Sequence, residues 1–261
     1  ICAHAGNVIT KKNKINLFKF LICVQIGRPF TKNIICCSNI VRESILKNLS
    51  LKKSETSVIY NCFNEKKFGI SKKTNSKNKI LHKNLTIGMV GRFEGHKNQL
   101  SLIKSIKILK ERDINVQLLL IGDGSNRDKL ENLSKTLKIK EKVRFLGARN
   151  DVNLLLEKLD IFVFSTTEDE GFGIALVEAM AKKIPIISSN VKACKEILLG
   201  GECGLLVKPN SGISIANGVE YVLKNKKETE RKVNNAYNLV INEYTQKVMS
   251  TKYFKALNLN Y

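Results

Sequence analysis

The chain has 261 residues, and 43% of them are hydrophobic, which is enough for a packed core and excludes a disordered chain. Lys and Arg number 45 against 23 Asp and Glu, and residues 1–84 alone carry 17 basic residues and three acidic ones. Such a positive field attracts polyanions, and an anionic membrane surface and nucleic acid both qualify. A general overuse of Lys explains the same excess without a partner.

The numbers and spacing of the cysteines and histidines narrow the class of protein further. The seven cysteines are an odd number, form no C-x-x-C pair and lie partly in apolar runs such as residues 34–37. They predict buried free thiols in a reducing compartment rather than a disulfide framework or metal site. With three His in total, a zinc site is not expected, and no apolar run approaches the roughly 18 residues of a membrane-spanning helix.

The first 84 residues carry a weak α/β pattern. We predict strands over residues 34–37 and 57–60, with a helix over residues 40–49 between them. Residues 65–84 are rich in Lys, Ser and Asn and lack periodicity, which is typical of an interdomain linker. Residues 1–64 therefore form one partial domain, followed by a linker.

From residue 85 onward, short apolar runs alternate with segments of helical spacing. The predicted strands span residues 85–90, 116–121, 143–146, 161–164, 185–188 and 205–207. The predicted helices span residues 99–110, 127–137, 152–159, 174–182 and 213–223. Continuous apolar strands that alternate with helices predict a parallel sheet covered on both faces, and hence a doubly wound domain over residues 85–227. Residues 228–261 are expected to form basic helices that pack back towards the N-terminal part.

Two glycine-containing loops follow the first two strands of this domain, where an open α/β sheet binds its ligand. In the segment GRFEGHK, Gly91 lets the backbone approach a ligand, and Arg92 and Lys97 offer two cations suited to a diphosphate. Two solvated cations beside a turn would fit the same segment. Gly122 follows the second strand, where it either contacts the ligand or serves a tight turn.

The third loop is the most informative, and it contains the segment EGFGIALVEAM. The amides of Phe172, Gly173 and Ile174 are expected at a helix N-terminus, where they point at an anion. Glu178 lies in an otherwise apolar helical segment, where an unpaired carboxylate is costly. A ribose diol or a nearby surface Lys would supply its partner.

Taken together, these segments resemble a known enzyme family. The strings GRFEGHKN, IGDG, VRFLG, EGFGIALVEAMA and GECGLLV are similar, in the expected order, to retaining GT-B glycosyltransferases of the glycosyl transferases group 1 family (glycosyltransferase family 4). The resemblance covers about residues 57–208 and implies an α/β fold with two Rossmann-like domains. It also implies an incomplete N-terminal domain, so we expect an N-terminally truncated fragment of a longer chain.

The resemblance assigns roles to residues of the third loop and its neighbours. It implies that Arg92 and Lys97 neutralise the donor diphosphate and that residues 171–174, including Gly171, contact sugar or phosphate through their amides. Glu170 is expected to contact the transferred sugar, and Glu178 to hold the ribose hydroxyls. Cations and amides then stabilise the leaving diphosphate in place of a metal ion, so no metal or cofactor is expected.

The remaining assignments lie further from the reacting centre. The donor base is expected beside Arg144 and Phe145, with Gly91 and Gly122 also lining the donor site. His4 lies in a segment that resembles the acceptor side of bacterial polysaccharide transferases. We weigh a contact of His4 with acceptor or sugar against a structural role.

The predicted function is transfer of a sugar from a nucleotide diphosphate-sugar to a glycan or lipid-linked acceptor, in bacterial surface-polysaccharide synthesis. We expect a cytoplasmic protein that contacts the inner face of the membrane through its basic N-terminal part. The alternatives are a UDP-sugar 2-epimerase of the same architecture and a truncated, non-catalytic nucleotide-sugar-binding fragment. Nucleic acid is not expected as a partner, because Trp is absent and the aromatic residues look buried.

Overall fold

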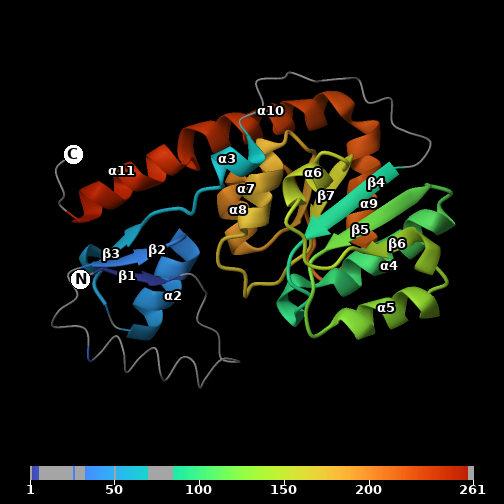
Figure 1. The fold of residues 1–261 in the computed structure, drawn as a ribbon, viewed down its shortest axis with the longest axis horizontal. Coiled ribbons are helices and arrows are strands. Elements are labelled where there is room, and N and C mark those ends of the chain that lie inside the picture. Colours follow the sequence, from blue (N-terminus) through green and yellow to red (C-terminus); the bar gives the residue numbers. More distant parts are fainter. Residues whose placement is uncertain (1, 6–25, 27–32, 50, 70–84, 258–261) are drawn as a thin grey trace.

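The computed structural model describes residues 2–5, 26, 33–49, 51–69 and 85–257, which form two α/β units (Figure 1). The N-terminal unit, described over residues 2–5, 33–49 and 51–60, contains a parallel sheet of order β1-β2-β3. Its strands are β1 (Cys2–Ala5), β2 (Asn33–Cys36) and β3 (Thr56–Val58). Helix α2 (Asn39–Leu49) follows β2, so the predicted strand–helix–strand pattern is confirmed to within about two residues at each end.

The segment after this unit differs in one respect from the predicted linker. Helix α3 (Glu65–Phe68) forms at its start, because the Asn64 side chain accepts a hydrogen bond from the backbone N–H of Lys67 and caps the helix. Phe68 is buried against the core of the C-terminal unit, which fixes the short helix. Residues 70–84 of the predicted linker lie outside the described residues.

The C-terminal unit, residues 85–224, contains a six-stranded sheet in which all strand pairs are parallel. The strands are β4 (Leu85–Val90), β5 (Val116–Ile121), β6 (Val143–Phe145), β7 (Ile161–Phe164), β8 (Ile186–Ser189) and β9 (Leu205–Val207). Most of their side chains are buried, as expected for strands that helices cover on both faces. The predicted doubly wound parallel sheet is therefore confirmed.

The helices of this unit connect successive strands. They are α4 (Gln99–Glu111), α5 (Arg127–Thr136), α6 (Val152–Leu156), α7 (Ile174–Ala181) and α8 (Lys192–Ile197), whereas α9 (Gly212–Lys224) follows the last strand. Helix α8 was not predicted, because six residues are too few to show a helical period in the sequence. It buries Ala193, Cys194 and Ile197 against the sheet.

The order of the strands indicates at which point of the sheet a ligand would bind. The order β6-β5-β4-β7-β8-β9 runs outward from β4 in both directions, so the connection reverses between β4 and β7. Open α/β sheets bind their ligands beyond the carboxyl ends of the strands at such a reversal. Figure 1 shows that the carboxyl end of β4 points towards the N-terminal unit, so the loops after β4 and β7 lie between the two units.

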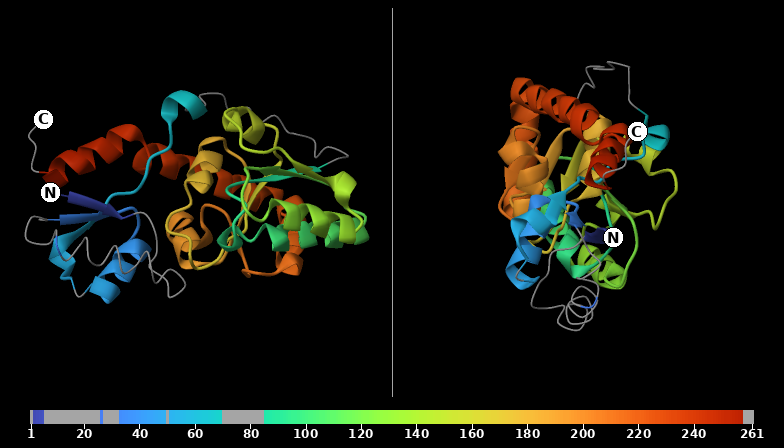
Figure 2. Two further views of the ribbon diagram at one scale, coloured as in Figure 1. Left: turned by 60° about the horizontal axis from the view of Figure 1, so that its bottom comes forward. Right: turned by 90° about the vertical axis from the view of Figure 1, so that its left-hand side faces the viewer.

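Two long helices complete the chain. Helices α10 (Lys226–Glu243) and α11 (Gln246–Leu257) run from the C-terminal unit back along the N-terminal unit (Figures 1 and 2). The N–H of Phe63 donates to the carbonyl of Tyr244 at 3.2 Å, and the N–H of Gln246 donates to Glu65 Oε2 at 2.7 Å. These bonds join the return helices to the segment that leaves the N-terminal unit.

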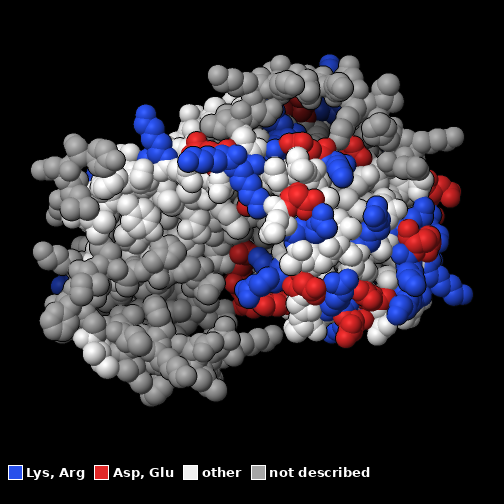
Figure 3. Space-filling model, in the orientation of Figure 1, with Lys and Arg blue, Asp and Glu red and all other residues white. Residues whose placement is uncertain are grey.

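The charged surface of the C-terminal unit is mixed rather than uniformly basic. Figure 3 shows Lys and Arg interspersed with Asp and Glu on the face that it presents. Ion pairs of the C-terminal unit include those of Arg112 with Glu220 and of Lys110 with Glu141. Within the described ranges, no helix is long and apolar enough to cross a membrane.

Gly122 provides a stability test of this arrangement, because its φ is +138° and an added Cβ would lie 2.1 Å from the carbonyl oxygen of Gly91. We predict that Gly122→Ala lowers the free energy of unfolding by about 2 kcal/mol or more. Gly95→Ala is the matched control, since a Cβ added at Gly95 would have no atom within 4 Å. Urea denaturation of both variants measures the difference, and equal stabilities would contradict the close approach of the two loops.

Candidate functional site

The loops that follow β4 and β7 are joined by hydrogen bonds at the reversal point of the sheet. The side-chain hydroxyl of Thr166 and the backbone N–H of Thr167 both donate to the carbonyl of His96, each at 2.9 Å. The hydroxyl of Ser165 donates to the carbonyl of Asn98 at 3.1 Å. These contacts fix the two loops relative to each other, although they come from segments far apart in the sequence.

The charged centre of the site is an ion pair between Lys97 and Glu170. The Lys97 Nζ atom lies 2.5 Å from Glu170 Oε2 and 5.0 Å from the centre of the Phe164 ring. The two side chains are 14% and 9% exposed, so each charge depends on the other for compensation. The structure thus brings together two of the residues selected from the sequence, one from each loop.

Arg92 lies differently from Lys97. Its side chain is 72% exposed and pairs with Glu94 at 2.9 Å, while its carbonyl accepts a hydrogen bond from Gln99 Nε2. An exposed ion pair of this kind contributes little to stability, so Arg92 can readily leave Glu94 for a more highly charged partner. Arg92 therefore lies at the rim of the site, outside the buried pair.

The loop after Glu170 turns into helix α7 and leaves backbone donors open. Gly173 has a φ of +91° and would place a Cβ 3.2 Å from the Phe164 ring, so this turn requires glycine. In the described part of the chain, the N–H groups of Gly173 and Ile174 have no hydrogen-bond acceptor. Open N–H groups at a helix N-terminus form a binding position for an anion.

The N-terminal unit contacts this loop directly. The Ser38 hydroxyl donates to the carbonyl of Gly171 at 2.6 Å. The ring of Phe172 lies 6.0 Å from the rings of Tyr60 and Tyr244, which are 5.5 Å from each other. Ser38 and Tyr60 were not selected from the sequence. A signal for Ser38 existed, since it lies between the predicted strand and helix of the N-terminal unit.

Glu178 lies on α7, one turn after Ile174, in a partly buried position. Burial raises the pKa of its carboxyl group to about 7, and the positive charge of Lys67 opposes this effect. The described residues offer the Glu178 carboxylate neither a hydrogen bond nor an ion pair. Hydroxyl groups of a ligand would satisfy this carboxylate, and among the described residues no Lys forms an ion pair with it.

The other residues selected from the sequence lie at different positions relative to the buried ion pair. Gly91 and Gly122 are in close backbone contact, and the Phe145 ring packs edge-on against Phe93 at 6.1 Å. Arg144 is exposed on edge strand β6 and does not contact the buried pair. His4 belongs to β1, and its side chain lies outside the described part of the chain.

The thiols and carboxylates of the described residues form no metal site. No group of three or more His, Cys, Asp or Glu side chains converges anywhere within the described residues. Cys37 and Cys194 lie near the site, but burial raises their pKa values to about 11 and 12, so both remain thiols at neutral pH. Cys36, Cys62, Cys194 and Cys203 are free thiols, as the sequence predicted.

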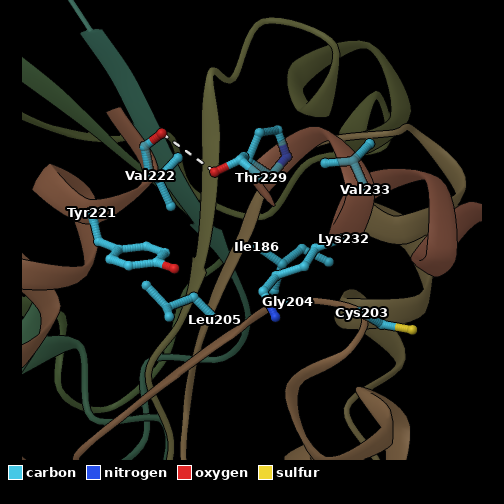
Figure 4. A pocket seen from close by; sticks show the side chains of 10 residues that line it. Ile186, Cys203, Gly204, Leu205, Tyr221, Val222, Thr229, Lys232 and Val233 are labelled. Atoms are coloured by element: carbon cyan, nitrogen blue, oxygen red, sulfur yellow. Dashed lines mark hydrogen bonds between the residues drawn. The ribbon is translucent and has the colours of Figure 1, made fainter. Parts of the chain in front are cut away.

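A small pocket on the C-terminal unit lies elsewhere. Figure 4 shows it between the starts of β8 and β9, with Ile186, Leu205 and Tyr221 among its lining side chains. All strands of this sheet are parallel, so this pocket lies at the edge opposite the loops that follow β4 and β7. Its lining is mainly apolar, and its one lining cation, Lys232, already binds Glu228 and the carbonyl of Gly201, so we do not assign the pocket to the site.

Solved structures define the class of this fold. The structure of Alr3699/HepE from Anabaena in complex with UDP and glucose matches with a TM-score of 0.85 and 21% identity, covering 98% of this chain and 71% of that one. WaaG, a glycosyltransferase involved in lipopolysaccharide biosynthesis, matches with a TM-score of 0.75 and 17% identity, covering 97% and 74%. The two units therefore have the GT-B fold that the sequence predicted.

Sequence comparison then gives the family. The family described as Glycosyl transferases group 1 matches residues 71–239, and the chain belongs to this family. It is 33% identical to the uncharacterized glycosyltransferase MJ1607 of Methanocaldococcus jannaschii over 220 residues, which are 81% of this chain and 56% of that protein. It is 26% identical to the capsular polysaccharide biosynthesis glycosyltransferase CapM of Staphylococcus aureus, covering 89% and 63%. The chain thus spans less than two thirds of the length of these relatives.

The raised pKa of Glu178 predicts a pH effect on stability. The folded chain binds this proton more tightly than the unfolded chain, so the stability that protonation contributes is present at low pH. It is lost as the pH rises from about 4.5, the ordinary value, to about 7. We predict that Glu178→Gln gains on the order of 2 kcal/mol relative to the wild type between pH 5 and pH 8.

Urea denaturation at both pH values measures this effect. Glu230→Gln is the control, because Glu230 is exposed on α10 and its replacement leaves the site intact. A constant difference between Glu178→Gln and the wild type at the two pH values would show that the Glu178 carboxyl is already ionised at pH 5.

Proposed function

We propose that this chain contains the donor-binding site of a retaining glycosyltransferase. It would transfer a sugar from a nucleotide diphosphate-sugar to a glycan or lipid-linked acceptor. The observation that carries the proposal is the buried pair of Lys97 and Glu170 beside the open N–H groups of Gly173 and Ile174. Membership of the group 1 family and the likeness to a fold that binds UDP and glucose in Alr3699/HepE support it.

The site suits the charge that develops when a glycosidic phosphate bond breaks. The leaving nucleoside diphosphate gains negative charge as the bond to the anomeric carbon lengthens. Lys97 and the N–H groups of Gly173 and Ile174 would stabilise this charge, with Arg92 turning in from the rim. The pair with Glu170 holds the Lys97 side chain in place before the donor arrives, so little rearrangement is needed.

Glu170 would act on the sugar side of the same bond. The sugar becomes positively charged at the anomeric carbon as the diphosphate leaves, and a nearby carboxylate lowers the energy of that state. Glu170 has one oxygen on Lys97 and the other 3.5 Å from the N–H of Phe172, which orients the carboxylate. Retention of configuration and the assignment to glycosyltransferase family 4 belong to this proposal and rest on the resemblance of the EGFGIALVEAMA segment.

Glu178 and the loops after β5 and β6 would bind the nucleoside. The partly buried carboxyl of Glu178 lacks a described partner, and the two hydroxyls of a ribose would supply one. Phe145, held by Phe93, would face the base, and Gly91 and Gly122 allow the backbone to approach it. Stabilisation of the diphosphate by Lys97 and amides gives no role to a metal ion or cofactor.

The biological setting is inferred from relatives. Matching proteins include an O-antigen chain mannosyltransferase of Salmonella typhimurium and an alpha-1,3-galactosyltransferase of Escherichia coli whose name gives a diphosphoundecaprenol-linked acceptor. We accordingly place this chain in the synthesis of a bacterial surface polysaccharide. Because a lipid-linked acceptor lies in a membrane, the basic residues of segment 1–84 would face the anionic inner surface of the cytoplasmic membrane.

Alanine substitutions test the proposed roles. We predict that Lys97→Ala and Glu170→Ala each lower the rate of sugar transfer by about 100-fold or more, because each removes charge stabilisation in the transition state. The rate is measured as release of nucleoside diphosphate from uridine, guanosine and adenosine diphosphate-sugars in the presence of lipid-linked acceptor.

Lys107→Ala is the matched control, since Lys107 is a partly exposed lysine of α4 that pairs with Glu111. Near wild-type release in both site variants would contradict the roles of Lys97 and Glu170. Isomerisation of a UDP-sugar without acceptor would instead indicate the 2-epimerase alternative.

A further inference from the structure

A single carboxylate of the C-terminal unit binds the N-terminal unit through four hydrogen bonds. Glu196 lies on α8, and its Oε1 accepts from the backbone N–H of Asn39 at 2.8 Å, from Asn39 Nδ2 at 2.8 Å and from the Tyr60 hydroxyl at 2.9 Å. Its Oε2 accepts from the backbone N–H of Ile40 at 3.3 Å. We call this set of contacts the Glu196 clasp.

The clasp uses the N-terminus of a helix. Asn39 is the first residue of α2, and the first N–H groups of a helix lack partners inside the helix and carry partial positive charge. Such groups are usually capped by a neighbouring residue of the same chain segment, whereas Glu196 lies 157 residues away and on the other unit. The bond therefore exists only when the two units lie in the observed relation.

Tyr60 strengthens the clasp because its phenol stays protonated. Burial and the charge of Glu196 raise the pKa of Tyr60 to about 12, so the hydroxyl donates to Glu196 at any physiological pH. Asn39 Nδ2 also lies 3.2 Å from the Tyr60 hydroxyl. One carboxylate thus fixes both Asn39 and Tyr60, and it makes charge-assisted hydrogen bonds, which are the stronger kind.

Both ends of the clasp lead to the loop that would bind the donor. Ser38 immediately precedes Asn39, and its hydroxyl donates to the carbonyl of Gly171. The Tyr60 ring packs against Phe172 at 6.0 Å. The N-terminal unit therefore contacts two consecutive residues of the loop, Gly171 and Phe172. The residue before them, Glu170, binds Lys97 on the other side of the loop.

We propose that Glu196 is a positioning residue for the transfer reaction. By holding Asn39 and Tyr60, it places Ser38 and Tyr60 against residues 171–172, which orients the open N–H groups of Gly173 and Ile174 for the donor diphosphate. Glu196 acts through the loop and does not contact substrate. The inference rests on the proposed function, because Glu196 would make the proposed donor site depend on how the two units are arranged.

Substitution of Glu196 tests the proposal in two independent ways. Glu196→Gln keeps the size of the side chain but replaces one acceptor oxygen with an NH2 group that faces other donors. Hydrogen exchange in the free protein is followed at the N–H groups of Phe172 and Leu176, which donate to Glu170 Oε1 and to the carbonyl of Gly173, and it is expected to accelerate by about ten-fold. Glu202→Gln is the control, because Glu202 binds Arg231 within the C-terminal half and is expected to leave this exchange unchanged.

The kinetic test uses a double-mutant cycle. We expect Glu196→Gln and Ser38→Ala each to lower kcat by about ten-fold or more, with a change in donor KM of less than about three-fold, because a displaced loop harms the transition state most. The kcat of the double variant is expected to be no lower than that of the more impaired single variant, since both substitutions act through the same loop. Glu196→Asp keeps the negative charge and is expected to recover part of the lost rate.

Unchanged hydrogen exchange in the loop of a folded Glu196→Gln protein overturns the proposal. So does a double variant in which the losses of kcat from Glu196→Gln and Ser38→Ala multiply. The exchange measurement needs no substrate. If the wild type fails to transfer sugar and faster loop exchange still follows Glu196→Gln, the proposed function fails while the positioning of the loop by Glu196 stands.

Discussion

The site depends on one buried ion pair, between Lys97 at the end of the loop after β4 and Glu170 in the loop after β7. Neither charge is tolerable alone in this position, because each side chain is largely removed from water. The pair therefore forces two loops together at the point where the order of the strands reverses. It also keeps a cation beside open N–H groups, which is the arrangement that stabilises a leaving diphosphate.

The second constraint comes from outside the C-terminal unit. Ser38 binds the carbonyl of Gly171, and Tyr60 packs on Phe172, so the N-terminal unit determines the shape of the loop on its far side. Helices α10 and α11 run along both units and hold the segment that connects them. A binding site prepared in this way requires both units, although most of its charged groups belong to one of them.

The sequence predicted the C-terminal sheet well, because its buried strands are continuous apolar runs. The limits of β4, β5, β7 and β9 agree with the predicted ranges, whereas α8 is too short to show a period. Lys97 and Glu170 could be selected because each lies in a loop directly after such a strand. Glu196 could not, since its role arises from a contact across 157 residues that leaves no pattern in the local sequence.

In the proposed function, this site binds a pyrophosphoryl group through Lys97 and main-chain N–H groups. Isothermal titration calorimetry of the chain with a nucleoside diphosphate, the matching monophosphate and the free nucleoside tests it most directly. We predict that the diphosphate binds at least about ten-fold more tightly than the monophosphate, because the second phosphate meets the cation and the helix N-terminus. Equal affinities for the diphosphate and the monophosphate would contradict it.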